Sequence, residues 1–434
     1  MPGAAKELLR THKGWSSPLC QELRLTEQLL PQEYGSCAVF LRQELLSKYS
    51  VCNPCVSYRK AMENSQSLAE FGFNLYKMQT GANVFFSPIS IVLALSMVYL
   101  GSVGDTKTEI SKVIFGGADQ CSAKLSMSQL LASVEPLESQ YGNMIFHVAN
   151  RMYVSQAAKI LESYKRAVRK HLEADAKPID VSDSEAAAKK VNKFISKETN
   201  GKITKAIDSL DKFTTLLLVN TIYFKAEWET EFSKEQTTEG LFYRNSTHPL
   251  KMPMMRARST DFLYYENEKY QVLGMPYKIS IYSMFVILPK SRSGLAETTK
   301  SLSGKELLNI FENATPQDVT VTFPKFAFEN SISLEKSLKE LGLGNLFTPG
   351  KANLSAIDPE QPLRLSKVLH NTFLKVDEEG TEAAAVTVVD IVADSAIIRK
   401  HNYSFNADHP FIFAIVDMSK QYLLFLGRFS GYEN

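Results

Sequence analysis

The sequence predicts an α+β fold in one large domain, because helical patterns dominate its first half and strand patterns its second half. The apolar residues Leu68, Phe71, Leu75 and Met78 recur at helical spacing. Residues 214–228, TTLLLVNTIYFKAEW, are β-branched, aromatic and almost continuously apolar, which is typical of a strand covered on both faces. We see neither β–α–β alternation nor an internal repeat.

A second helix is expected directly after Ser87, an N-cap residue that is followed by Pro88 at the first helical position. The next run, ISIVLALSMVYL, is apolar all round, which predicts a buried helix. Further helices and strands are predicted from capping boxes, from glycines that end helices and from β-prone runs. These are helices after 106–109 and 182–185 (the latter ending at Asn200-Gly201), a helix at 334–343 closed by Gly342 and Gly344, strands at 279–289, 318–329 and 367–380, and a final hairpin of 409–417 and 422–429.

The bulk properties are those of an ordinary globular chain, with 434 residues and a net charge of +2. That charge gives no reason to expect a nucleic acid or a membrane as partner. No apolar run approaches the roughly 20 residues that span a bilayer. The N-terminus lacks the apolar stretch of about 7–15 residues that a secretory signal requires. We therefore expect a cytoplasmic protein, with nuclear residence or release without a signal peptide left open.

The first 61 residues differ from the rest, because their periodicity is poor and they hold most of the cysteines. We expect an unassigned N-terminal extension over 1–61, open to being disordered, and one domain over 62–434. Cys52 and Cys55 form a C-x-x-C motif, which occurs in redox pairs and in half-sites for zinc. No second such pair follows, so we expect free thiols and neither a metal nor a cofactor. The cysteines are Cys20, Cys37, Cys52, Cys55 and Cys121, the last alone in the body of the chain.

Motifs of common enzymes are absent from the sequence. It contains no G-x-S-x-G, H-E-x-x-H or G-x-x-x-x-G-K-[ST] pattern, and its seven histidines are scattered. A catalytic triad needs no local signature, so this absence only lowers the odds of hydrolytic chemistry. We expect no catalytic residue and no enzyme.

The most informative stretch is residues 378–387, EEGTEAAAVT, which is followed by the β-prone run VVDIVA. Small residues between strands usually form a linker. Because successive side chains of a strand point to opposite faces, this stretch divides into two parities. Every charge in 381–391 falls on one parity, so the other could enter a sheet without burying a charge. That charge-free parity is Thr381, Ala383, Ala385, Thr387, Val389 and Ile391.

Several segments resemble the serpin family in family order, and the resemblance covers roughly 62–434. EEGTEAAAVT resembles the hinge of inhibitory serpins, and FNADHPFIFAI at 405–415 resembles the serpin signature. FFSPISI, LVNTIYFKAEWETEF and SKVLHNTFLKVDEEG are similar to the start of helix B, to the segment from strand 3A to the breach, and to strand 5A. Met62 onward resembles the start of intracellular, ovalbumin-like members.

The resemblance implies three β-sheets, eight to nine helices and an exposed reactive loop, here about 378–402. A monomeric suicide inhibitor of proteases is implied, in which the cleaved loop inserts into sheet A and the protease stays covalently bound. Insertion of this kind adds a strand to a sheet and releases stored strain. The implied hinge comprises Glu378, Glu379, Gly380, Thr381, Glu382, Ala383, Ala384, Ala385, Val386 and Thr387.

In inhibitory serpins the scissile bond follows the fourteenth residue after the hinge glycine, which implies cleavage between Asp394 and Ser395 here. Ile391, Val392 and Ala393 would then precede the bond. An acidic residue before it requires a cationic pocket in the protease, often with Arg. Granzyme-B-like serine proteases and caspases have such pockets. Cleavage beside Ala393 or Ser395, or at Arg399 by a trypsin-like enzyme, stays open.

Other matched positions are implied to be structural. Ser87, Ser90, Asn220 and His370 fall where serpins keep the shutter, a buried polar cluster, and Trp228 falls at the breach. Val386 departs from the small residue usual in the hinge, but its parity faces outward. A non-inhibitory serpin, acting as carrier or chaperone, is the alternative from another class. Sequons at Asn245, Asn313, Asn353 and Asn402 would matter only in an exported protein.

Overall fold

The computed structural model describes residues 54–134, 138–139, 142–245, 249–381 and 403–432, and within these ranges the side chains from residue 65 on except those of 138–139 and 142–143. The chain divides into two compact units, 1–63 with 118–125, and 64–117 with 126–434. The second unit holds both large sheets. Helix α4 (Pro54–Lys77) runs across the position, between 61 and 62, where the sequence predicts a domain boundary.

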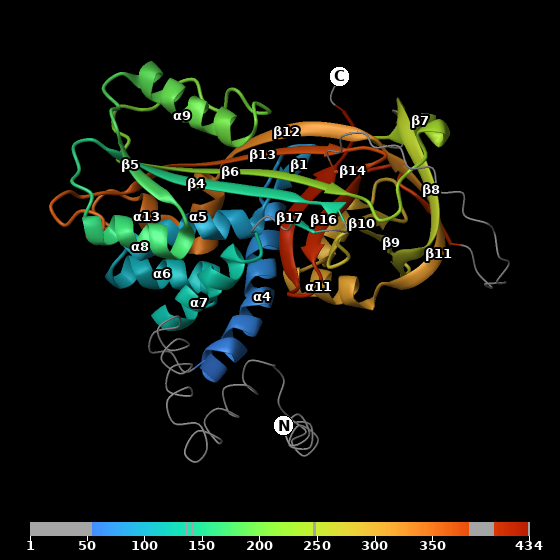
Figure 1. Ribbon diagram of the computed structural model, residues 1–434, viewed down its shortest axis with the longest axis horizontal. Coiled ribbons are helices and arrows are strands. Elements are labelled where there is room, and N and C mark those ends of the chain that lie inside the picture. The colour runs from blue at the N-terminus through green and yellow to red at the C-terminus, as the bar shows by residue number, and fades with distance from the viewer. Residues whose placement is uncertain (1–53, 135–137, 140–141, 246–248, 382–402, 433–434) are drawn as a thin grey trace, which may run out of the picture. The chain divides into compact units, whose positions relative to one another are not determined.

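The sheet that matters for function has six strands in the order β12-β13-β14-β6-β4-β5 (Figure 1). Its two long central strands, β6 and β13, pair directly with each other in parallel. The two-residue strand β14 lies between them at one end and is antiparallel to both. The bounds are β12 Phe326–Ser333, β13 Leu365–Val376, β14 Gly380–Thr381, β6 Leu216–Glu227, β4 Ile145–Ser155 and β5 Asp175–Ile179.

The described residues also form a nine-stranded sheet and a two-stranded one. The larger follows the order β1-β17-β16-β10-β9-β8-β11-β15, with β7 paired to β8, and its strands β10, β16 and β17 are buried and largely apolar. The bounds are β1 Val84–Phe86, β7 Thr238–Tyr243, β8 Pro249–Glu266, β9 Tyr270–Pro276, β10 Tyr282–Pro289, β11 Thr315–Pro324, β15 Tyr403–Asn406, β16 Phe411–Asp417 and β17 Tyr422–Phe429, with β2 Glu138–Ser139 and β3 Gly142–Asn143 in the small sheet.

Helices cover both faces of the six-stranded sheet (Figure 1). On one face the largely apolar α5 packs against β6, β4 and β17. On the other, α9 rests on an apolar cluster that includes Leu217 and Val219 of β6 and Leu369 of β13. The bounds are α5 Pro88–Gly101, α6 Gly104–Phe115, α7 Gln120–Leu131, α8 Glu162–Leu172, α9 Ser184–Glu198, η1 Lys234–Gln236, α10 Leu295–Ser301, α11 Gly304–Asn313, α12 Glu335–Leu338, η2 Lys339–Leu343 and α13 Gly344–Phe347.

The helix after Ser87 is confirmed as buried, with Leu100 partly exposed, and the Ser87 hydroxyl accepts a hydrogen bond from the Ser90 N–H. The helices predicted from the two capping boxes at 106–109 and 182–185 exist, but the predicted positions of their N-termini are wrong. Helix α6 begins before Thr106, whose hydroxyl instead accepts from the Asn353 N–H, and the α9 N-cap is Asp183.

Two further boundaries differ from the sequence prediction. The strand expected over 318–329 is two strands in different sheets, β11 and β12, which meet at Lys325. Gly342, with φ 104°, makes a kink inside η2, and α13 starts at Gly344 where the helix was expected to close. One β–α–β unit, β4–α8–β5 with parallel strands, was not anticipated.

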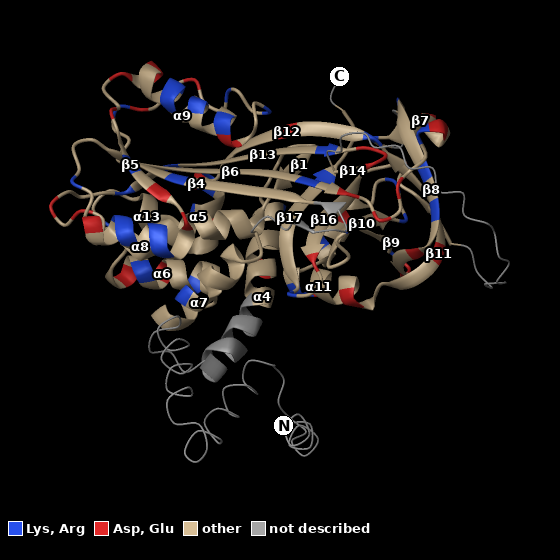
Figure 2. Cartoon of the chain, in the orientation of Figure 1, with Lys and Arg blue, Asp and Glu red and all other residues tan. Residues whose placement is uncertain are grey.

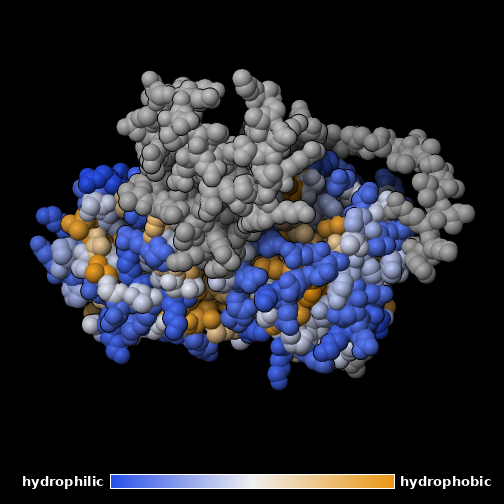
Figure 3. Space-filling model, turned by 90° about the horizontal axis from the view of Figure 1, so that it is seen from below, coloured by the Kyte–Doolittle hydropathy of each residue, from blue (hydrophilic) through white to orange (hydrophobic). Residues whose placement is uncertain are grey.

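The expectation of free thiols is wrong for Cys121, which is disulfide-bonded. The other four cysteines lie outside the residues whose side chains are described. Lysines and arginines are spread among carboxylates over the helices and strand edges (Figure 2), and the face in Figure 3 is mostly hydrophilic where it is described. No helix of the described part is both long and apolar enough to cross a membrane.

Candidate functional site

The site is the seam between β6 and β13, where the sheet is closed by direct parallel pairing. His370 pairs with Asn220, and the pairing runs on to Phe373 opposite Tyr223. Beyond that point the two strands diverge, and β14 lies between them. Gly380 pairs with Glu227 and Thr381 with Ala226, while Thr381 also pairs with Val376. The chain therefore re-enters the sheet as an antiparallel wedge at the open end of the seam.

Gly380 and Thr381 fit this wedge for steric reasons. A Cβ atom on Gly380 would lie 2.1 Å from the carbonyl oxygen of Ala226, so no larger residue can approach the strand as closely. The Thr381 side chain is fully buried, and its hydroxyl lies 2.8 Å from the Tyr277 hydroxyl. The first residue of the charge-free parity thus points into the core. Burial raises the pKa of Tyr277, so its phenol stays neutral at this contact.

Trp228 lies at the same end of the seam. Its indole Nε1–H donates to the Asp377 carbonyl oxygen at 3.0 Å, and its backbone N–H donates to the Glu379 carbonyl oxygen at 2.9 Å. Its ring stacks on Tyr277 with the centroids 4.6 Å apart. The segment that leads from β13 into β14 is therefore held by a buried aromatic pair.

The two acidic residues before Gly380, Glu378 and Glu379, each form an ion pair with a lysine. Lys325 Nζ lies 2.7 Å from a Glu378 carboxylate oxygen, and the Thr237 hydroxyl donates to the same carboxylate at 2.9 Å. Burial alone would raise the pKa of Glu378, but these bonds outweigh it and the pKa is lowered. Glu379 pairs with Lys234.

A buried polar cluster crosses the seam halfway along it. The Ser87 N–H donates to His370 Nε2 at 3.0 Å, so the ring proton sits on Nδ1, which contacts the Asn220 Oδ1. Asn220 Nδ2 in turn donates to Ser90 Oγ and to Asn150 Oδ1, both at 2.5 Å. Desolvation lowers the pKa of His370 to about 3, so the imidazole is neutral. The cluster ties α5, β6 and β13 together.

A family model described as serpin, serine protease inhibitor, matches residues 66–431. The chain belongs to the serpin family. Leukocyte elastase inhibitor of Xenopus laevis is 35% identical over 383 residues, covering 85% of this chain and all of that protein. Intracellular coagulation inhibitor 1 of Tachypleus tridentatus is 33% identical, covering 83% and 87%. The crystal structure of Serpin48 from the insect Tenebrio molitor matches with a TM-score of 0.77 at 28% identity, covering 86% and 98%.

The structure of this serpin brings together the predicted cluster of Ser87, Ser90, Asn220 and His370, and it places Trp228 beside the first residues of the predicted hinge. Four of the predicted hinge positions are described, from Glu378 to Thr381. The rest of the predicted site lies outside the described residues: Glu382, Ala383, Ala384, Ala385, Val386, Thr387, Ile391, Val392, Ala393, Asp394 and Ser395.

Sequence reasoning missed four residues that contact the predicted hinge or the buried cluster from other parts of the chain: Tyr277, Lys325, Lys234 and Asn150. Nothing in their local sequence distinguishes them from ordinary strand and loop residues. Only the pairing of distant strands brings them to the seam.

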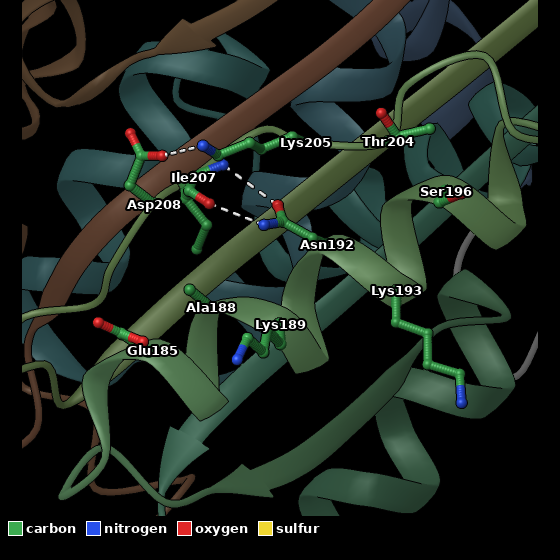
Figure 4. A pocket seen from close by; sticks show the side chains of 10 residues that line it. All are labelled: Glu185, Ala188, Lys189, Asn192, Lys193, Ser196, Thr204, Lys205, Ile207 and Asp208. Carbon is green, nitrogen blue, oxygen red and sulfur yellow. Dashed lines mark hydrogen bonds and ion pairs between the residues drawn. The ribbon is translucent and has the colours of Figure 1, made fainter.

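Two cavities lined by described residues lie beside α9. One, of about 540 Å³, lies between α9 and the loop that follows it, and Figure 4 shows Asn192 bonded to Ile207 and Lys205 paired with Asp208 there. Within the described ranges no group of three or more His, Cys, Asp or Glu side chains could hold a metal ion.

Proposed function

We propose that this serpin inhibits serine-type endopeptidases as a suicide substrate, with residues 378–402 as bait. The single observation that carries this proposal is the wedge β14. It lies antiparallel between two strands that otherwise pair with each other, and its Thr381 side chain already faces the core. A cleaved segment that continued from Thr381 would add a strand with its charge-free parity inward. The two relatives named as inhibitors above support the same function.

The proposed reaction begins when the serine Oγ of the protease attacks the carbonyl carbon of Asp394. The bond to the Ser395 nitrogen breaks, the new amine leaves with a proton, and an ester joins the protease to Asp394. Insertion of the freed segment then carries the attached protease along the sheet. If insertion outpaces hydrolysis of the ester, the complex stays covalent.

The proposed target is a protease that accepts Asp before the scissile bond. A carboxylate buried without a partner costs several kcal/mol, so the pocket must supply a cation. Arg pairs with a carboxylate through two hydrogen bonds, and granzyme-B-like serine proteases are the first choice, with caspases second. We further propose a cytoplasmic location.

The test is to incubate the full chain with granzyme B, with a caspase and with trypsin, and to examine denaturing gels. We expect a stable complex with granzyme B and release of the fragment Ser395–Asn434. Asp394→Asn, the matched neutral variant, should lose that complex. Cleavage without a complex for all three enzymes would exclude inhibition, and a complex with trypsin alone would move the bond to Arg399.

The alternative is a non-inhibitory serpin acting as carrier or chaperone. Such relatives tend to carry bulky or charged residues on the inserting parity. Thr381, Ala383, Ala385 and Thr387 are small, which favours the inhibitor.

A further inference from the structure

Two buried histidines of this serpin differ in what their rings contact. His370 Nε2 accepts a hydrogen bond from the Ser87 N–H, so one ring proton suffices there. His409, which is 6% exposed, lies between two groups that can only accept. Its Nδ1 is 2.7 Å from a carboxylate oxygen of Asp408, and its Nε2 is 2.6 Å from the carbonyl oxygen of Pro289. The His409 ring therefore meets an acceptor at each of its nitrogens.

The His409 ring satisfies both contacts only as an imidazolium. A neutral imidazole carries one N–H, so its other nitrogen presents a lone pair. That lone pair would face either the Pro289 carbonyl oxygen or the Asp408 carboxylate within hydrogen-bond distance, where two acceptors repel each other. Two hydrogen bonds of this length require a proton on each nitrogen.

A proton on the carboxylate of Asp408 is disfavoured by its other partner. The Arg292 guanidinium donates to the second carboxylate oxygen at 2.8 Å. Burial alone would raise the pKa of Asp408, but the bonds from His409 and Arg292 outweigh it and the pKa is lowered. The described residues place one more titratable group here, Tyr243, whose ring lies 3.6 Å from the Arg292 guanidinium carbon. Asp408 is thus an anion between two cations.

We propose that Arg292, Asp408 and His409 form a proton-dependent clasp that anchors strand β15 to the nine-stranded sheet. With both ring nitrogens protonated, the clasp is closed. Loss of one ring proton replaces a hydrogen bond by a repulsive contact and opens it. The inference goes beyond the proposed function and does not depend on it.

β15 is a short strand at the edge of its sheet, with four residues paired in parallel to β11. The chain that leaves it is held at three points. The Ala407 N–H donates to the Thr322 carbonyl oxygen at 3.0 Å, and the Asp408 carbonyl oxygen accepts from the Tyr243 N–H, at the end of β7, at 2.7 Å. The imidazolium then bonds to Pro289, the last residue of β10. The clasp therefore ties the exit of β15 to two further strands.

The position of the clasp gives it a consequence for the predicted reactive loop. β15 begins at Tyr403, directly after the segment that the sequence assigns to that loop. The clasp should stabilise this anchor most fully in acid and lose its contribution as the pH rises and the ring gives up its second proton. The sign is opposite to that of His370, which is neutral in the folded chain.

The first test observes the ring protons. The full chain, labelled with ¹⁵N in histidine, is examined by NMR at pH 7, and His409→Gln identifies the signals of His409. We expect two protonated ring nitrogens for His409 and one for His370, the internal control. Asp408→Asn should leave His409 with one ring proton, because an amide can donate to Nδ1. A single protonated nitrogen in the wild type would overturn the clasp.

The second test compares the wild type, His409→Gln and His409→Arg at pH 6 and pH 9 by urea unfolding. Gln cannot donate along both directions, whereas Arg stays charged and has several donors. We expect the folding equilibrium constant of the wild type to exceed that of His409→Gln about 10- to 100-fold at pH 6. Most of that advantage should be lost at pH 9, and His409→Arg should show no such loss.

Hydrogen exchange in β15, corrected for the chemical effect of pH, shows whether the clasp acts on this strand. It should quicken in the wild type between pH 6 and pH 9 and be quick at both values in His409→Gln. An advantage of the wild type that is equal at both pH values, or exchange in β15 that is the same in both proteins, would refute the proposal. If His409→Gln does not fold, Asp408→Asn keeps the imidazole and still tests its second proton.

Discussion

His370 of β13 and Asn220 of β6 are paired across the seam and share a contact between Nδ1 and Oδ1. Each also reaches α5, His370 through the Ser87 N–H and Asn220 through Ser90 Oγ. A strand that entered the seam between β6 and β13 would have to separate this pair, because the two residues are direct partners in the closed sheet. The cluster therefore stabilises the closed sheet with bonds that insertion would have to exchange.

The first prediction concerns pH. The pKa of His370 is about 3 in the folded protein, below the value of about 6.5 expected in the unfolded chain. Between these values the unfolded chain binds more protons, so the stability from this group is complete above about pH 6.5 and falls as pH drops toward 3. The slope is at most about 1.4 kcal/mol per pH unit. Urea unfolding at pH 7 and pH 5 should show a smaller loss for His370→Gln than for the wild type. Equal losses would contradict the prediction.

The second prediction concerns Gly380. An alanine there would place its Cβ 2.1 Å from the Ala226 carbonyl oxygen, so the wedge must move out of the sheet. We expect Gly380→Ala to destabilise the native state by about 1–3 kcal/mol, as other overpacked sites do. Chemical unfolding measures this, and Gly350→Ala tests backbone strain alone, because no atom lies within 4 Å of its added Cβ and its φ is 73°. A stability of Gly380→Ala equal to the wild type would show that the wedge is not tightly packed.

A third prediction follows from the inward direction of Thr381. Thr381→Arg would force a cation into the core beside Tyr277, so insertion should fail and the protein should be cleaved as a substrate. Thr381→Val keeps the shape, loses only the hydroxyl contact and should still form complexes. The ratio of complex to cleaved inhibitor on denaturing gels distinguishes these results. Unchanged inhibition by Thr381→Arg would refute the assigned parity.

The fourth prediction concerns the pair of Lys325 and Glu378. Lys325→Met keeps the aliphatic stem but leaves the buried Glu378 carboxylate with Thr237 as its remaining side-chain donor. We expect a loss of about 1–3 kcal/mol at pH 7. Because the folded pKa of Glu378 is lowered, the wild-type advantage should be present above about pH 4.5 and shrink as pH falls through the folded value. Lys351→Met controls for the loss of an exposed charge, and an advantage that persists at acid pH would disprove the ionic contribution.

Local patterns in the sequence predicted the elements whose signals are strong. The apolar run after Ser87 is a buried helix, and the residues around Asn220 form a strand covered on both faces. Element boundaries set by tertiary contacts were missed. Thr106 resembles an N-cap, but its hydroxyl bonds to the distant Asn353 N–H, and Lys325 separates two strands that follow different sheets.

The sequence alone determined which side chains of the bait are free of charge, because strand alternation depends only on position along the chain. It also determined, through resemblance, the residues of the buried cluster. Only the tertiary structure decided that Thr381 faces inward and that Tyr277 and Lys325 contact the residues around Gly380. These relations join residues on strands far apart in the chain, and pairing register and sheet order, which set them, are not encoded in any local pattern.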